Sequence, residues 1–152
     1  MIVSIALLAA SAMSLNCVLD PPRDVQMDGD KLKSQVINLP PEMSKLAFNL
    51  EIDPAKEAQG VKLDWPGDPI RAGRAAGLIA VGPQDYSFVS FHSGPCLFTV
   101  SGCLFLYTVS VQPDRSAVIL VQPAALWTDG QRVSRPFQAY MTGRCQPKGQ
   151  SK

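Results

Sequence analysis

Residues 103–122, CLFLYTVSVQPDRSAVILVQ, hold two apolar runs on either side of a polar, proline-containing segment. Four large side chains in the first run occupy alternate positions and share one face of a predicted β-strand: Phe105, Tyr107, Val109 and Val111. The start of its other face is also apolar, and residues 117–122 are apolar almost without interruption. Such runs are typical of strands covered on both faces, so we expect two central strands.

The rest of the chain repeats this pattern in short pieces. Thirteen prolines divide it, and proline breaks both helices and central strands. Alternating segments predict further strands at 46–52, 61–65, 77–82, 86–91, 96–100 and 135–145. Residues 25–39 predict a hairpin around Asp28-Gly29, and residues 53–60 a short helical turn. The predicted fold class is therefore all-β: a single small antiparallel sandwich or barrel-like domain with disulfides, after an N-terminal signal segment.

The first nineteen residues contain no charged side chain and are dense in Ile, Val, Leu and Ala. An apolar run followed by small residues predicts a secretory signal peptide at 1–14, cleaved near 12–14. The other expected parts are a linker at 15–24, a β-rich domain at 25–147 and a disordered tail at 148–152. Three alternatives remain open: an uncleaved membrane anchor, a buried helix, or a lipoprotein acylated at Cys17. The residue before Cys17 is Asn16, where a lipoprotein peptidase prefers a small side chain.

An even number of cysteines in an exported chain predicts disulfides, and four cysteines allow three connectivities. A hairpin turning at Thr99-Val100 would place Cys96 opposite Cys103, which leaves Cys17 to pair with Cys145. Zinc sites usually combine close cysteine pairs or histidines, whereas redox pairs are normally C-x-x-C. The spacing here fits neither, so we expect no metal.

The two halves of the chain differ in charge, although the whole carries only +1. Residues 20–70 sum to −4 and residues 71–152 to +5. The basic side chains are scattered, which argues against a nucleic-acid surface. The asymmetry indicates either complementary parts of one domain or an anionic partner for the second half.

The most distinctive segment for chemistry is LDWPGDPIRAGR, residues 63–74. Five of its side chains could line a lip that binds a saccharide or an anion, since loops often carry function: Asp64, Trp65, Asp68, Arg71 and Arg74. The alternative is a turn whose tryptophan fills the core. His92 is the only histidine, and no motif for nucleophilic catalysis, phosphate binding or a cofactor surrounds it.

These observations predict an exported, non-enzymatic protein, periplasmic or secreted, that binds a ligand or helps to assemble an envelope. A bacterial envelope is favoured because the chain has no N-x-S/T sequon. We expect an envelope protein or an anionic or saccharide ligand as partner, no cofactor and no nucleic acid. A membrane would be a partner only if the chain is lipidated or uncleaved. The alternatives are the Cys17 lipoprotein and a small hydrolase with a site near Asp64, Asp68 and His92.

Overall fold

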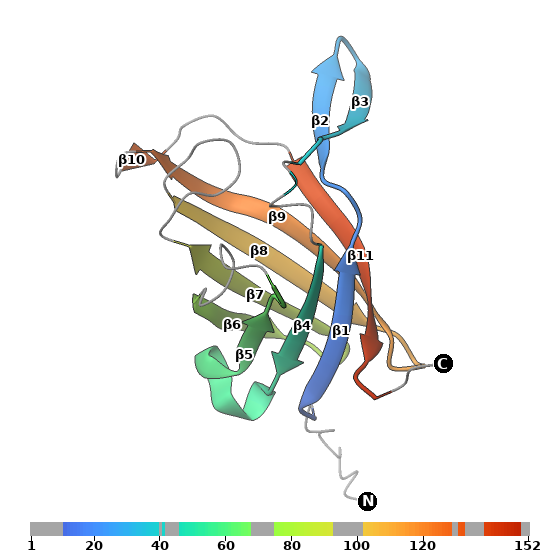
Figure 1. Cartoon of the computed structure of the whole chain (residues 1–152), viewed down its shortest axis with the longest axis vertical. Coiled ribbons are helices and arrows are strands. Elements are labelled where there is room, and N and C mark those ends of the chain that lie inside the picture. Colours follow the sequence, from blue (N-terminus) through green and yellow to red (C-terminus); the bar gives the residue numbers. More distant parts are fainter. Residues whose placement is uncertain are drawn as a thin grey trace, which may run out of the picture.

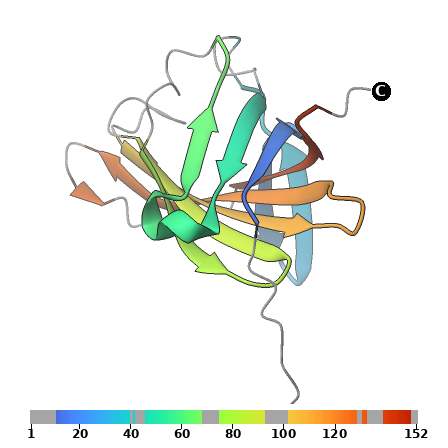
Figure 2. The ribbon, with the colours of Figure 1, turned by 90° about the horizontal axis from the view of Figure 1, so that it is seen from below.

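A computed structural model of the chain describes residues 11–39, 41, 46–67, 75–92, 102–128, 131–132 and 139–149. Eleven antiparallel strands within these ranges form one sheet, whose main path runs β5-β4-β1-β11-β9-β8-β7-β6. The sheet curls until its two end strands come into contact, and a short helical turn packs on β6 beside them. The result is a nearly closed barrel (Figures 1 and 2), which confirms the predicted all-β, antiparallel and barrel-like fold; the signal segment before it stays a prediction.

The strands of the first half, with the helical turn η2 between the last two, are β1 Met13–Leu19, β2 Arg23–Asp28, β3 Lys31–Val36, β4 Ala47–Ile52, η2 Pro54–Gln59 and β5 Val61–Asp64. Asp53 caps η2, since its Oδ1 accepts a hydrogen bond from the Ala55 N–H at 3.2 Å. Gly60 ends the turn, with its N–H donating to the Glu57 carbonyl oxygen. The predicted strands 46–52 and 61–65 and the turn between them are therefore confirmed.

The strands of the second half are β6 Ala75–Val81, β7 Asp85–His92, β8 Gly102–Val111, β9 Ala117–Thr128, β10 Gln131–Arg132 and β11 Ala139–Pro147. They confirm the strands expected at 77–82, 86–91, 103–111 and 117–122, and the part of 135–145 from residue 139 onward. The strand expected at 96–100 lies outside the described residues. The long strands β8 and β9 are joined by a turn at Gln112–Ser116. They pair with each other from Val111–Ala117 to Gly102–Trp127.

The core fills the inside of the barrel with one side chain from every second position. Phe105, Tyr107 and Val109 are buried on β8, as the alternation predicted, and the ring of Tyr107 stacks on Phe88 with centroids 4.6 Å apart. The outer face of the barrel is more exposed to solvent than expected. Val118, in the run predicted to be covered on both faces, is 48% exposed, since no described strand or helical turn packs over β9 there. The continuous apolar run therefore marks a barrel wall and not a two-sided central strand.

The expectation of a linker at residues 15–24 is wrong except for residues 20–22, since residues 23–24 begin β2. Residues 15–19 belong to β1, which lies between β4 and β11 and buries Leu15, Cys17 and Leu19. Alternation within an uncharged run explains the difference: every second residue faces the core, and the others face outward. Most of the predicted signal peptide, 1–14, lies outside the described residues. Of the predicted tail, Lys148 is tied to the barrel, since its N–H donates to the Ser14 carbonyl oxygen at 2.9 Å.

Cys17 and Cys145 form a disulfide, which confirms one predicted pair. Cys103 is also disulfide-bonded, whereas Cys96 lies outside the described residues. In the described sheet, the residues opposite Cys103 are His92 on β7 and Leu126 on β9, and the pairing of Cys96 with Cys103 stays a prediction.

The predicted hairpin around Asp28-Gly29 is confirmed as β2 and β3, with Asp28 opposite Lys31 and Gly29 at φ 63°. It projects from one end of the barrel as an arm (Figure 1). Within the described part of the chain, no helix is both long and apolar enough to cross a bilayer.

Candidate functional site

The structure does not bear out the predicted lip as far as its residues are described. Trp65 is only 4% exposed, and its ring stacks on Phe48 with centroids 4.4 Å apart. It therefore fills the core instead of offering a platform to a ligand. Asp64 is exposed at the end of β5 and accepts a hydrogen bond from the Asn49 side-chain amide at 3.1 Å. The other three predicted residues, Asp68, Arg71 and Arg74, lie outside the described residues.

The described residues do not form an arrangement that supports the hydrolase hypothesis. Strands β5 and β7 run in the same direction, so Asp64 and His92 end their strands at the same end of the barrel. Strand β6 lies between them, however, and the side chain of His92 is outside what the structure describes. Among the described side chains, no cluster of histidine, cysteine and carboxylate residues could hold a metal ion.

A pocket of about 520 Å³ lies at the opposite end of the barrel, where β1 and β7 begin and β8 and β11 end. These ends meet because neighbouring strands are antiparallel. The size is within the usual range for a small-molecule site, and barrel mouths are common places for one. We call this pocket the mouth; its lining residues are Ser11–Leu15, Pro83, Gln84, Tyr86, Val111–Pro113, Arg115, Pro147 and Lys148.

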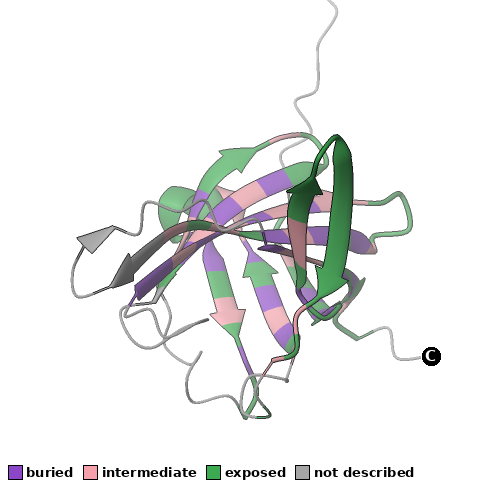
Figure 3. Ribbon diagram, turned by 90° about the horizontal axis from the view of Figure 1, so that it is seen from above, coloured by how far each residue is buried: buried purple, intermediate pink, exposed green. Residues whose placement is uncertain are grey.

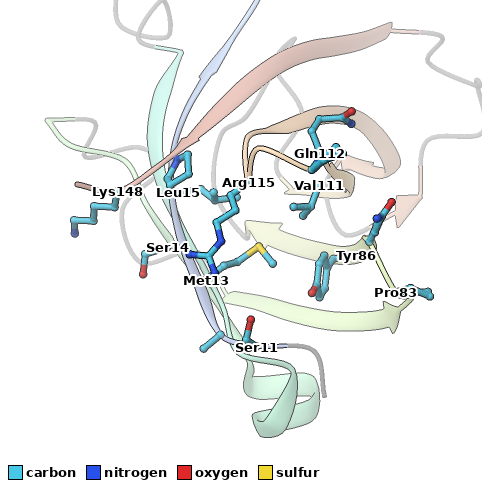
Figure 4. A pocket seen from close by; sticks show the side chains of 14 residues that line it. Ser11, Met13, Ser14, Leu15, Pro83, Tyr86, Val111, Gln112, Arg115 and Lys148 are labelled. Carbon is cyan, nitrogen blue, oxygen red and sulfur yellow. The ribbon is translucent and has the colours of Figure 1, made fainter. Parts of the chain in front are cut away.

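The lining of the mouth combines apolar side chains with cations. Met13, Leu15 and Val111 supply apolar surface, whereas Arg115 and Lys148 supply positive charge, and none of the described lining residues is an acid. Figure 4 shows the Arg115 side chain reaching across the opening toward Met13 and Ser14, with Lys148 at the rim. This arrangement suits a ligand with an apolar body and an anionic group.

Arg115 is held in place by an ordered turn. The Gln112 N–H donates to the Ser116 carbonyl oxygen at 2.7 Å, and the Arg115 N–H donates to the Gln112 carbonyl oxygen at 2.9 Å. Oδ1 of Asp114 accepts from both the N–H and the hydroxyl of Ser116, and these bonds lower the pKa of the Asp114 carboxyl. Arg115 itself has φ 67°, a conformation that costs an L-residue energy. The backbone is therefore strained at Arg115, the residue whose guanidinium group lies at the mouth.

Tyr86 adds a hydrogen-bond donor on the other side of the mouth. Its ring is almost completely buried, and Figure 4 shows it pointing from β7 into the opening. Burial raises the pKa of the phenol above its ordinary value of 10.0. The group therefore stays protonated at neutral pH, and its O–H can donate to an anion.

Sequence reasoning missed the mouth because its residues come from four separate segments, 11–15, 83–86, 111–115 and 147–148. In the sequence, Arg115 is one of several scattered basic residues, and Tyr86 is one residue of a predicted strand. The one sequence signal that bears on the mouth is the net charge of +5 over residues 71–152, the half that supplies both cations.

The fold and the mouth together define a class: a small, disulfide-bonded antiparallel β-barrel with one open, cationic end. No family model, no curated protein and no solved structure matches the chain. The case for a function therefore depends on the geometry.

Proposed function

We propose that this protein is an exported β-barrel that binds a small amphipathic anion in its mouth. The observation that carries the proposal is the presence of Arg115 and Tyr86 around one opening that also has apolar side chains and no acid among its described lining residues. An anionic group would accept hydrogen bonds from the guanidinium and the phenol. The apolar body would lie against Met13, Leu15 and Val111.

Export is supported by two features at the N-terminal end. The buried Cys17–Cys145 disulfide suits an oxidising compartment, because cytosolic thiols are usually kept reduced. The apolar run before β1 has the length of a signal-peptide core. Cleavage after Ala12 would leave β1 whole, whereas cleavage after Ser14 would remove two residues that pair with β4. Cleavage after Ala12 would also remove Ser11 and Ala12 from the lining of the mouth and place the new α-amino group of Met13 there, where it adds positive charge.

Acylation of Cys17 conflicts with the structure. One sulfur atom cannot carry both a lipid thioether and the disulfide to Cys145. Cleavage before Cys17 would also remove Met13–Asn16 from β1, including buried Leu15.

The binding test uses the fluorescent apolar anion 8-anilinonaphthalene-1-sulfonate, with decanoate and its uncharged counterpart 1-decanol as competitors. We expect the probe to bind folded wild-type protein at one site and decanoate to displace it far better than decanol. Arg115→Gly should weaken binding roughly tenfold or more, because a charge-assisted hydrogen bond is lost. Arg115→Lys should retain part of the affinity. Arg144→Gln, which removes an exposed cation from β11 outside the mouth, is the matched control and should leave binding unchanged.

Equal displacement by decanoate and decanol, or equal loss in the Arg115→Gly and Arg144→Gln variants, would overturn the proposed ligand class. The export half is tested separately, by intact mass and N-terminal sequencing of unreduced protein recovered from a bacterial expression host. The expected product begins at Met13 and contains no free thiol. Recovery from the cytosol with free thiols and residues 1–12 attached contradicts export.

A further inference from the structure

The first residue of β1, Met13, is held at the mouth by the strands on both sides of it. The register pairs Met13 with Ile52 of β4 and Ser14 with Glu51. On the other side, the Ser14 carbonyl oxygen accepts a hydrogen bond from the Lys148 N–H at 2.9 Å. Buried and exposed residues alternate along the barrel strands (Figure 3), and Met13 is on the inward, partly buried side of β1. A chain that began at Met13 would keep these contacts and have its end at the mouth.

The guanidinium group of Arg115 lies on the same side of the mouth as Met13. Figure 4 shows the Arg115 side chain reaching from the β8–β9 turn toward Met13 and Ser14. Neither Arg115 nor Lys148 forms an ion pair with any acid that the structure describes. A positive group at Met13 would therefore stand beside a cation that has no counter-ion within the described part of the chain. Two like charges repel each other, and a bound anion between them would relieve that repulsion.

We propose that the α-ammonium group of Met13, which cleavage after Ala12 creates, binds the anionic group of the ligand together with Arg115. This inference rests on the proposed function, since it needs both the cleavage and an anionic ligand. Before cleavage, the Met13 nitrogen belongs to an uncharged peptide bond, and Ser11 and Ala12 also line the mouth. The precursor therefore lacks one of the two cations. Removal of residues 1–12 converts the mouth from weak to tight binding of the anion, so that binding begins after export.

The α-ammonium group predicts a pH dependence that no other described group of the mouth would give. An α-amino group ordinarily titrates near about pH 8, and the charge of Arg115 should lower its pKa in the empty mouth. A bound anion should raise the pKa again, so binding takes up protons and weakens as the pH rises through the bound-state pKa. Burial raises the pKa of Tyr86 above 10.0, and lysine and arginine side chains titrate only above this range. His92 ends β7 at the opposite end of the barrel.

Four acids belong to the elements around Met13 but are not among the described lining residues of the mouth: Glu51, Asp53, Asp85 and Asp114. Three of them have partners of their own. Asp53 pairs with Lys56 at 3.1 Å, Asp85 accepts a hydrogen bond from the Ser110 hydroxyl at 2.6 Å, and Asp114 accepts from Ser116. Glu51 is exposed and lies opposite Lys62 on β5. Carboxyl groups titrate in the acid range, so these acids do not produce a change near pH 8.

The first test alters the charge of the α-amino group and nothing else. It uses the exported chain that begins at Met13, with 8-anilinonaphthalene-1-sulfonate as the probe. Acetylation at about pH 6.5 modifies the α-amino group before lysine, because lysine holds its proton more tightly. It leaves an uncharged amide like that of the precursor and should weaken probe binding roughly tenfold. Reductive dimethylation of the same group keeps its positive charge and is the matched control, so affinity should stay nearly unchanged. Intact mass and peptide mapping verify a single modification, at Met13.

The second test follows the proton. Unmodified protein should lose roughly tenfold in probe affinity between about pH 6.5 and 9.5, whereas the acetylated protein should give a flat profile. Isothermal titration calorimetry with decanoate near pH 8, in buffers that differ in ionisation enthalpy, should report proton uptake on binding to the unmodified protein only.

Arg115→Gly distinguishes failure of this inference from failure of the proposed function. If Arg115→Gly weakens binding but acetylated and unmodified protein bind equally, the mouth binds anions without the α-ammonium group, and the inference is overturned. If Arg115→Gly and acetylation both leave binding unchanged, the proposed function fails and this inference fails with it. An exported chain that begins anywhere other than Met13 also overturns the inference.

Discussion

Cys17 on β1 and Cys145 on β11 are directly opposed, with Cα atoms 4.0 Å apart, and their disulfide links the first and last strands of the barrel. Both residues are buried, and 128 positions of sequence separate them. The bond therefore closes almost the whole domain into one covalent loop.

Replacing both residues, Cys17→Ala/Cys145→Ala, should lower the free energy of unfolding by about 2–5 kcal/mol. The main reason is that the unfolded chain regains the conformational freedom that a cross-link closing a very long loop removes. Urea unfolding monitored by tryptophan fluorescence gives the value. An unfolding free energy equal to that of the wild type would show that the cross-link is not an important source of stability.

Gly143 should not tolerate a side chain. It lies opposite Leu19, and a Cβ atom there would come within 2.4 Å of the Val18 carbonyl oxygen and 2.8 Å of the Leu19 Cδ2. We expect Gly143→Ala to destabilise the barrel by about 1–3 kcal/mol, as overpacking does. Gly77→Ala is the control, because its Cβ would meet only the Ala58 carbonyl oxygen at an ordinary 3.5 Å. Equal melting temperatures for the two variants would contradict this prediction.

Arg115→Gly should weaken ligand binding without lowering the stability of the fold. Glycine adopts φ 67° without the steric cost that arginine bears, but it gains freedom in the unfolded chain. The net change in unfolding free energy is expected to lie between zero and about 1 kcal/mol in favour of the glycine variant. Arg115→Ala removes the same cation yet keeps the strain, so it should unfold at lower urea than Arg115→Gly. The reverse order would argue against strain at this position.

The turn that presents Arg115 should loosen in acid. The Asp114 carboxyl has its pKa lowered by the hydrogen bonds from Ser116, chiefly the one from the hydroxyl. A lowered folded-state pKa stabilises the fold above the ordinary value of 3.8, and that contribution is lost as the pH falls through the folded-state pKa. Amide hydrogen exchange at Ser116 should therefore accelerate below about pH 4, once intrinsic exchange is corrected for. Asp114→Ala, which removes the acceptor, should show fast exchange at neutral pH as well, and slow exchange in this variant would contradict the assignment.

The sequence alone determined the local features of this protein. Alternation at Phe105, Tyr107 and Val109 predicts a strand with one buried face, and Asp28-Gly29 predicts the hairpin turn. Both depend on neighbours in the chain, because strand pleat and turn geometry are local properties. The pairing of Cys17 with Cys145 also follows from the sequence, but only by elimination once Cys96 is assigned to Cys103.

Only the tertiary structure decided which segments meet. It made residues 15–19 a strand of the wall, because β4 and β11 offer hydrogen bonds on both sides. It placed Trp65 against Phe48 inside the barrel, away from any ligand. It also brought Tyr86 and Arg115 to one mouth, since antiparallel order returns the start of β7 and the β8–β9 turn to the same end. Distances between such remote segments depend on strand order and register, which no local pattern specifies.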